Sequence, residues 1–180
     1  MAAASELLDE AGPEALTVRA IAHRAGCSTM VVYSHFGGKD GVVEALYVQG
    51  FERLGAVLRG IRHTGDPVAD LQRLGRAYRR FALDHPTSYR VMFTRAVPDF
   101  EASPAAAALA SATLDVLAER VARAVDAGSL GPGEPRQLAA CLWAAIHGAV
   151  SLELQDAGPP DIDWPACHER MLAALSTGIG

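Results

Sequence analysis

The 180-residue sequence has few cysteines, a single lysine and no long apolar run. Cys27, Cys141 and Cys167 lie far apart and form no CxxC pair, which argues against a disulfide scaffold and favours reduced thiols. No stretch reaches the roughly 18 uninterrupted apolar residues of a membrane-spanning helix, and residues 138–150, the nearest candidate, contain a histidine. The start has no basic segment leading into an apolar one. We therefore expect a cytoplasmic protein with no membrane partner.

Signals for β-strands and for catalysis are also absent. Val31–Val32 is the longest β-branched run, and apolar residues recur at helical spacing nearly throughout. Helix starts are predicted at Pro67, Pro86 and Pro104, where the missing N–H group costs nothing. The sequence contains no phosphate-binding glycine loop, and its adjacent cysteine and histidine at 167 and 168 point to different helix faces. We predict an all-α fold of eight or nine helices, with no cofactor, no metal and no enzyme activity.

The N-terminal helices are predicted to be short and the next one long. Short helices are expected over residues 2–11, 18–25 and 28–33. The long helix runs over about 39–62, with one apolar stripe along it. Because no Gly/Ser-rich linker follows, this helix itself joins the two parts. The predicted domains are residues 1–45 and residues 46–180.

A helix, a glycine turn and a second short helix are predicted between residues 17 and 33. Thr17 is a natural N-cap of the first helix, Gly26 permits the sharp turn, and Ser28 caps the second. This is the outline of a helix-turn-helix, whose second helix lies in the DNA major groove. Spacing alone is weak support, because many helical hairpins share it.

Two longer patterns resemble the tetracycline-repressor (TetR) family of transcription regulators. Residues 16–42 contain L-T-V-R-A-I-A, A-G-C-S and V-Y-S-H-F-G-G-K, which are similar to the family's N-terminal domain. Residues 142–148, L-W-A-A-I-H-G, resemble the W-x-x-x-H-G pattern of its WHG-type effector domain. The resemblance implies a three-helix helix-turn-helix domain, joined by a long helix to a larger helical domain for ligand binding and dimerisation.

The resemblance also implies eight DNA-binding residues. Thr29, Met30 and Ser34 would reach base edges, and a Thr or Met methyl group can pack on a thymine methyl. The expected backbone contacts are Tyr33, His35, Lys39 and Thr17, and Ser28 completes the set. Met30 stands where the family usually has a small residue, so base recognition there is not carried over.

The charge distribution keeps a second interpretation open. Residues 1–50 hold three cationic and six acidic residues, a net −3, whereas residues 51–95 hold nine arginines against four acids, a net +5. Weak attraction to phosphates is therefore expected from the N-terminal part. The family usually carries basic residues ahead of the first helix, and here either that arm is absent or the true start lies upstream of Met1. The negative charge, together with an absent arm, slightly favours the alternative, a helical protein-interaction module that has lost DNA binding.

The larger domain offers an effector pocket and a dimer surface. The pocket residues are expected to be Tyr89, Met92, Phe93, Trp143 and His147, although each of these also suits an ordinary core. Arg73, Arg76 and Arg80 share a helix face that suits an acidic effector or, more simply, solvent.

Two apolar stripes follow the helix of about residues 136–156, one of Leu138, Leu142, Ala145, Ala149 and Leu152 and the other of Trp143, Ile146, Val150 and Leu154. Surplus apolar surface there and on the last helix suggests a two-fold dimer. The predicted interface is Leu138, Leu142, Ala145, Ala149, Leu152, Met171 and Leu175. Which stripe faces the partner stays open. We expect a DNA-binding regulator, a repressor, that binds a palindromic operator as a homodimer and is released by a small-molecule effector.

Overall fold

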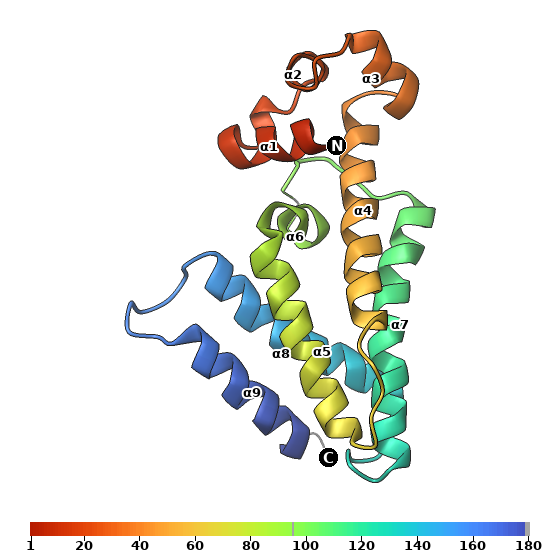
Figure 1. Cartoon of the computed structure of the whole chain (residues 1–180), viewed down its shortest axis with the longest axis vertical. Helices are drawn as coiled ribbons and strands as arrows, with labels where there is room; N and C mark the ends of the chain where they lie inside the picture. The colour runs from red at the N-terminus through yellow and green to blue at the C-terminus, as the bar shows by residue number, and fades with distance from the viewer. Residues whose placement is uncertain (95, 179–180) are drawn as a thin grey trace. The chain divides into compact units, whose positions relative to one another are not determined.

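The computed structural model describes residues 1–94 and 96–178, with the side chains of 175–178 excepted. Within these ranges it contains α-helices, one 3-10 turn and no strand (Figure 1), so the predicted all-α class is confirmed. The helices are α1 (Ala2–Ala11), α2 (Val18–Arg24), α3 (Thr29–Phe36), α4 (Lys39–Arg59), α5 (Pro67–Asp84), α6 (Pro86–Phe93), α7 (Pro104–Asp126), α8 (Pro135–Leu154) and α9 (Trp164–Gly178).

The predicted helix boundaries are set by caps and prolines. The Thr17 hydroxyl accepts a hydrogen bond from the Ala20 N–H at 3.1 Å, and Ser28 caps α3 in the same way. The helices α5, α6 and α7 each begin at the predicted proline. However, α3 continues to Phe36, three residues past its expected end. It ends there because Gly37 adopts a left-handed conformation with φ of 73°.

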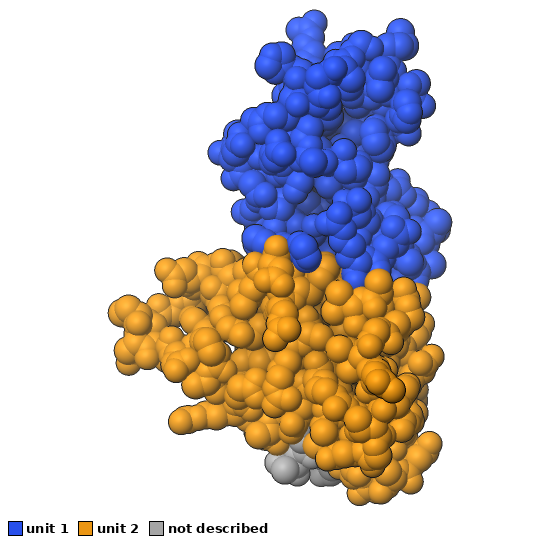
Figure 2. Space-filling model, viewed as in Figure 1, with its two compact units in different colours: residues 1–53, 85–110 blue, residues 54–84, 111–180 orange. Residues whose placement is uncertain are grey.

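The chain forms two compact units that divide it differently from the boundary expected at residue 45 (Figure 2). The first unit comprises residues 1–53 and 85–110, and the second comprises residues 54–84 and 111–180. The helices α4 and α7 each contribute residues to both units. The helix α6 belongs to the first unit because Asp9 of α1 accepts hydrogen bonds from the Thr87 hydroxyl and, at 2.8 Å, from Arg90 Nη2.

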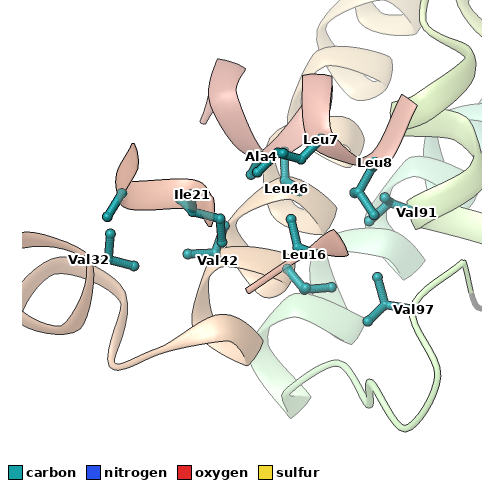
Figure 3. Close-up of a cluster of buried hydrophobic side chains, with 12 residues drawn as sticks. Ala4, Leu7, Leu8, Leu16, Ile21, Val32, Val42, Leu46, Val91 and Val97 are labelled. Atoms are coloured by element: carbon teal, nitrogen blue, oxygen red, sulfur yellow. The ribbon is translucent and has the colours of Figure 1, made fainter. Parts of the chain in front are cut away.

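The core of the first unit lies around the first turns of α4 (Figure 3). Val42 and Val43 are fully buried there, and Ile21 of α2 and Val32 of α3 reach the same cluster. These contacts fix the two short helices against α4. The cluster also includes Val91 and Val97, from a part of the chain far along the sequence, which explains why the unit extends beyond residue 45.

The second unit is a helical bundle in which α5 packs against both α8 and α9. The buried face of α8 carries Ala139, Leu142, Ile146 and Val150, which step by three, four and four residues. This face takes members from both predicted stripes. The opposite, exposed face of α8 contains Cys141, Ala144, Gly148 and Leu152.

Of the described helices, only α8 is long and apolar enough to cross a membrane by length and composition, a property that core helices of soluble proteins share. Its Glu153 is ion-paired with Arg79 of α5, and its His147 is hydrogen-bonded to Tyr78 of the same helix. These polar contacts hold α8 in the helical bundle of the second unit.

Candidate nucleic-acid interface

The helix α3 presents large apolar side chains to solvent around its core anchor, Val32. Val32 is only 3% exposed, whereas Met30 is 73%, Tyr33 54% and Val31 42% exposed. At about 100° per residue, Met30 and Ser34 both lie roughly 160° from Val32 around the helix. Met30 and Ser34, two of the side chains expected to read bases, are therefore exposed on the same side of α3 and take no part in the core.

The polar groups near the end of α3 are engaged by the helix itself. Ser34 Oγ donates to the Val31 carbonyl oxygen at 3.0 Å, and His35 Nδ1 lies 3.0 Å from the same oxygen. Because a carbonyl only accepts, Nδ1 carries the proton in this contact, and in the neutral ring Nε2 is then an acceptor. His35 can thus receive a hydrogen bond through Nε2, and Ser34 can accept one on its oxygen.

The capping hydroxyls keep one hydrogen-bond donor each. Thr17 and Ser28 accept bonds from the backbone N–H groups of Ala20 and Val31, and both residues are exposed. An accepting hydroxyl still has its own proton to donate. Both side chains are therefore placed to donate to a phosphate oxygen without giving up the cap.

Electrostatics favour an anion at this surface more than the charge of the whole N-terminal part suggests. Residues 17–39 contain Arg19, Arg24 and Lys39 and no acid. Arg24 is held by Glu10 at 2.6 Å and by Glu6 at 3.2 Å, contacts that raise the pKa of its guanidinium. The acids of α1 thus neutralise one arginine, while Arg19 and Lys39 form no ion pair with another described residue.

An acidic depression lies at the beginning of α4, beside this surface. Its lining includes four carboxylates, Asp40, Glu44, Asp99 and Glu101, around a volume of about 240 Å³. Like charges repel, so phosphates are excluded here. The depression therefore limits how far a nucleic-acid contact can extend from Lys39 along α4.

Three of the residues expected in an effector pocket pack in the first unit. Tyr89 is fully buried and its ring lies 4.9 Å from that of Phe93, which in turn meets Phe51 of α4 at 5.3 Å. Met92 packs against Gly50, where an added side chain would come within 2.6 Å of its sulfur.

The other two expected pocket residues belong to a polar network in the second unit. His147 Nδ1 lies 2.9 Å from the Tyr78 hydroxyl, and Trp143 Nε1 donates to that hydroxyl at 3.3 Å. Ser151 Oγ lies 3.4 Å from His147 Nε2. Burial lowers the pKa of His147, so its ring is neutral near pH 7. Tyr78 and Ser151 carry no local sequence signal, and only the packing of α5 on α8 identifies them.

Ion pairs engage much of the arginine-rich face of α5. Arg76 binds Glu169 of α9 through Nε and Nη2, with the shortest contact at 2.7 Å, and Arg79 binds Glu153 of α8 with Nε 2.8 Å from Oε2. Arg73 contacts the buried Asp70. Much of the positive charge that an acidic effector would need is thus already balanced. Among the described residues, no group of three or more His, Cys, Asp or Glu side chains could hold a metal ion.

The residues predicted for the dimer surface differ in exposure. Leu142 is buried in the core of its own chain, and Leu152 is 46% exposed. Leu138, Ala145, Ala149 and Met171 are half-buried, and the side chain of Leu175 lies outside the described residues. Leu152 thus remains the prediction most available to a partner.

Comparisons with known proteins agree on one family. The family model described as "Bacterial regulatory proteins, tetR family" matches residues 1–46, and "Tetracyclin repressor-like, C-terminal domain" matches residues 71–175. The HTH-type transcriptional regulator Rv1816 of Mycobacterium tuberculosis is 26% identical, with 83% of this chain and 76% of the relative covered.

Solved structures have the same fold. The crystal structure of the regulatory protein SCO4313 superposes with a TM-score of 0.80 at 27% identity, covering 96% of this chain and 90% of the other. That of the TetR-family regulator PfmR from Thermus thermophilus gives 0.76 at 19% identity, covering 99% and 97%.

Proposed function

The chain belongs to the TetR family of bacterial transcription regulators, and we propose that it represses transcription by binding a palindromic operator as a homodimer. A small-molecule effector releases the DNA. The observation that carries the proposal is the exposed face of α3, with Thr29, Met30, Tyr33 and Ser34 presented beside unpaired cations. A regulator of this kind works in the cytoplasm, where the bacterial chromosome lies.

The proposed contacts divide into those that position the protein and those that read sequence. Tyr33, Lys39 and His35 meet phosphates, as do the capping hydroxyls of Thr17 and Ser28. Thr29, Met30 and Ser34 face the base edges. Because the reading helix is only eight residues long, one subunit covers a short half-site. Two subunits related by a two-fold axis would read a palindrome.

A gel-shift titration with the DNA that flanks its own gene tests this proposal. Binding is expected at low salt and, with sequence preference, at moderate salt. Tyr33→Ala and Lys39→Ala should weaken binding to all sequences alike, whereas Thr29→Val should change the preference among sequences. If no duplex is bound at any salt concentration, the alternative remains, a helical interaction module that uses α2 and α3 only as a fold element.

The homodimer is proposed to use the exposed face of α8 together with α9. That face carries small residues and Leu152, which a mate helix could approach closely. Leu152→Arg should therefore yield a monomer in sedimentation velocity without unfolding the chain. The matched control is Leu83→Arg, since Leu83 of α5 is also an exposed leucine, 37% exposed, and lies off this face. A monomeric wild-type protein contradicts the proposal.

The effector is proposed to act through the network of Tyr78, Trp143 and His147. It would shift the dimer from a state that binds the operator to a state that binds it less tightly. The helix α4 supports this proposal, since it runs unbroken from residues of the first unit to residues of the second. A ligand changes DNA affinity only as far as it prefers one state. Equal operator affinity of free and effector-bound dimers contradicts this mechanism.

A further inference from the structure

The reading helix lacks the side chains that specify bases through paired hydrogen bonds. Arg or Lys reads guanine and Asn or Gln reads adenine with two bonds each, and Glu or Asp accepts a bond from cytosine. The sequence of α3, T-M-V-V-Y-S-H-F, contains none of these six residue types. The common hydrogen-bonding code for base pairs is therefore not available on this helix.

The remaining polar donors on α3 are partly used within the helix. Both Ser34 Oγ and His35 Nδ1 are engaged by the Val31 carbonyl oxygen. Donating either proton to a base would break a bond that already exists, so little free energy is gained by the exchange. Direct readout by donors is thus weak at two of the positions expected to face DNA.

What α3 does offer to a partner is apolar surface. Met30 is 73% exposed and Val31 42% exposed, adjacent residues on a helix that the rest of the unit holds from the opposite side. On the base edges of the major groove, the large apolar group is the C5-methyl of thymine. A surface of this chemistry, in a helix-turn-helix segment whose cations Arg19 and Lys39 form no ion pair with another described residue, matches duplex DNA that presents thymine methyl groups.

Resting on the proposed function, we propose that the operator half-site is read chiefly by contacts of Met30 and Val31 with thymine methyl groups. The operator therefore has A·T pairs at the positions that α3 faces. Phosphate contacts supply affinity without sequence preference, so the methyl contacts supply most of the discrimination. Met30 and Val31 would each contact a different methyl group, because adjacent residues point about 100° apart around the helix.

The test begins with the full-length protein and a random duplex library. Selection at fixed salt identifies an enriched half-site, and each thymine in it is then replaced by deoxyuridine, which pairs identically but lacks the methyl group. Removal of one buried methyl group should lower the affinity about fourfold per contacted thymine, or about sixteenfold when the same thymine is changed in both half-sites. Replacing the same T·A pair by 5-methylcytosine·guanine should retain more affinity than cytosine·guanine does.

Variants then assign each methyl contact to a side chain. The measured quantity is the ratio of the affinities for the thymine duplex and the deoxyuridine duplex. Met30→Ala should bring this ratio to about one at one position and leave it unchanged at the other, and Val31→Ala should do the reverse. Lys39→Ala is the control, since it should weaken binding to both duplexes equally and leave the ratio unchanged. Met30 and Val31 are exposed and Lys39 is half-buried with no ion pair to another described residue, so thermal unfolding should show all three variants folded.

The outcomes separate this inference from the proposed function. Specific binding with deoxyuridine ratios near one, or selected half-sites with G·C pairs throughout the contacted positions, overturns the inference and leaves the DNA-binding function intact. Absence of binding to every duplex in the library overturns both. A thymine-to-deoxyuridine ratio that neither Met30→Ala nor Val31→Ala changes also overturns the assignment to these two side chains.

Discussion

The start of α4 contains a glycine whose missing side chain makes room for the end of α3. A methyl group at Gly41 would lie 1.7 Å from the Phe36 carbonyl oxygen and 2.8 Å from its carbonyl carbon. Both atoms are backbone, so neither can rotate away. Since real contacts of this kind stay above 3.0 Å, Gly41→Ala requires the two helices to separate by at least about 1.3 Å.

The cost of this separation can be estimated against the gain from alanine. Overpacking of a tight contact costs about 1–3 kcal/mol, whereas alanine is favoured over glycine in a helix by about 0.5–1 kcal/mol. With the middle of each range, about 2 and about 0.75 kcal/mol, the free energy of unfolding should fall by about 1 kcal/mol. For a chain of this length that is a decrease in Tm of about 2–4 °C.

Thermal unfolding and gel shift together measure the two expected effects. Because α3 carries the proposed DNA contacts, its displacement should lower operator affinity by more than the loss of folded protein explains. The control is Gly55→Ala in the same helix, where a methyl group would meet the guanidinium end of Arg59 at 3.0 Å. That flexible end can swing away, so Tm should stay constant or rise. A Gly41→Ala protein with wild-type Tm and affinity would refute the packing of α3 against α4.

Three further predictions concern buried and half-buried polar groups of the second unit. Asp70 is fully buried, and although burial raises its pKa, hydrogen bonds from Thr64 and the charge of Arg73 lower it overall. Asp70→Ala should cost about 1–3 kcal/mol in a denaturant titration, because the Thr64 donors lose their acceptor and the buried Arg120 loses its counter-charge, and a variant of wild-type stability contradicts this. Burial chiefly lowers the pKa of His168 below 6.5, so stability should decline as the pH falls through that value. His168→Leu should reduce this decline in Tm measured between pH 7.5 and 5.5, and an undiminished decline in the variant contradicts the assignment to His168. Arg79→Met and Glu153→Leu should each lower stability by about 1–3 kcal/mol, while the double variant loses less than their sum in a double-mutant cycle.

Local signals in the sequence predicted most of the helix boundaries. The caps at Thr17 and Ser28 and the prolines that begin α5, α6 and α7 act within one turn of chain, so a short window contains the whole cause. The helix α3 is longer than the sequence predicts. Several glycines of the sequence could end a helix, and the sequence does not show which of them adopts the left-handed conformation. Exposure of Met30 follows from helical periodicity once Val32 is placed in the core, because Met30 lies roughly 160° from Val32 around the helix.

Features that depend on distant parts of the chain could not be predicted in the same way. The contact of Arg76 with Glu169 joins residues 93 positions apart, and no local pattern indicates it. The two stripes on α8 have equally good helical spacing, so only the observed packing shows that Leu142 and Ile146 share one buried face. The polar network around His147 depends on Tyr78 for the same reason.

The place of α6 in the first unit bears on how hybrid regulators should be engineered. Exchanging only residues 1–46 between relatives would pair the Asp9 side chain with a foreign helix at Thr87 and Arg90, and would leave Val91 facing unmatched neighbours. A chimera that also transplants residues 85–110 keeps this interface native. The unit that carries the helix-turn-helix is therefore made of two separate segments of the sequence. An exchange of residues 1–46 alone would leave the second segment, residues 85–110, behind.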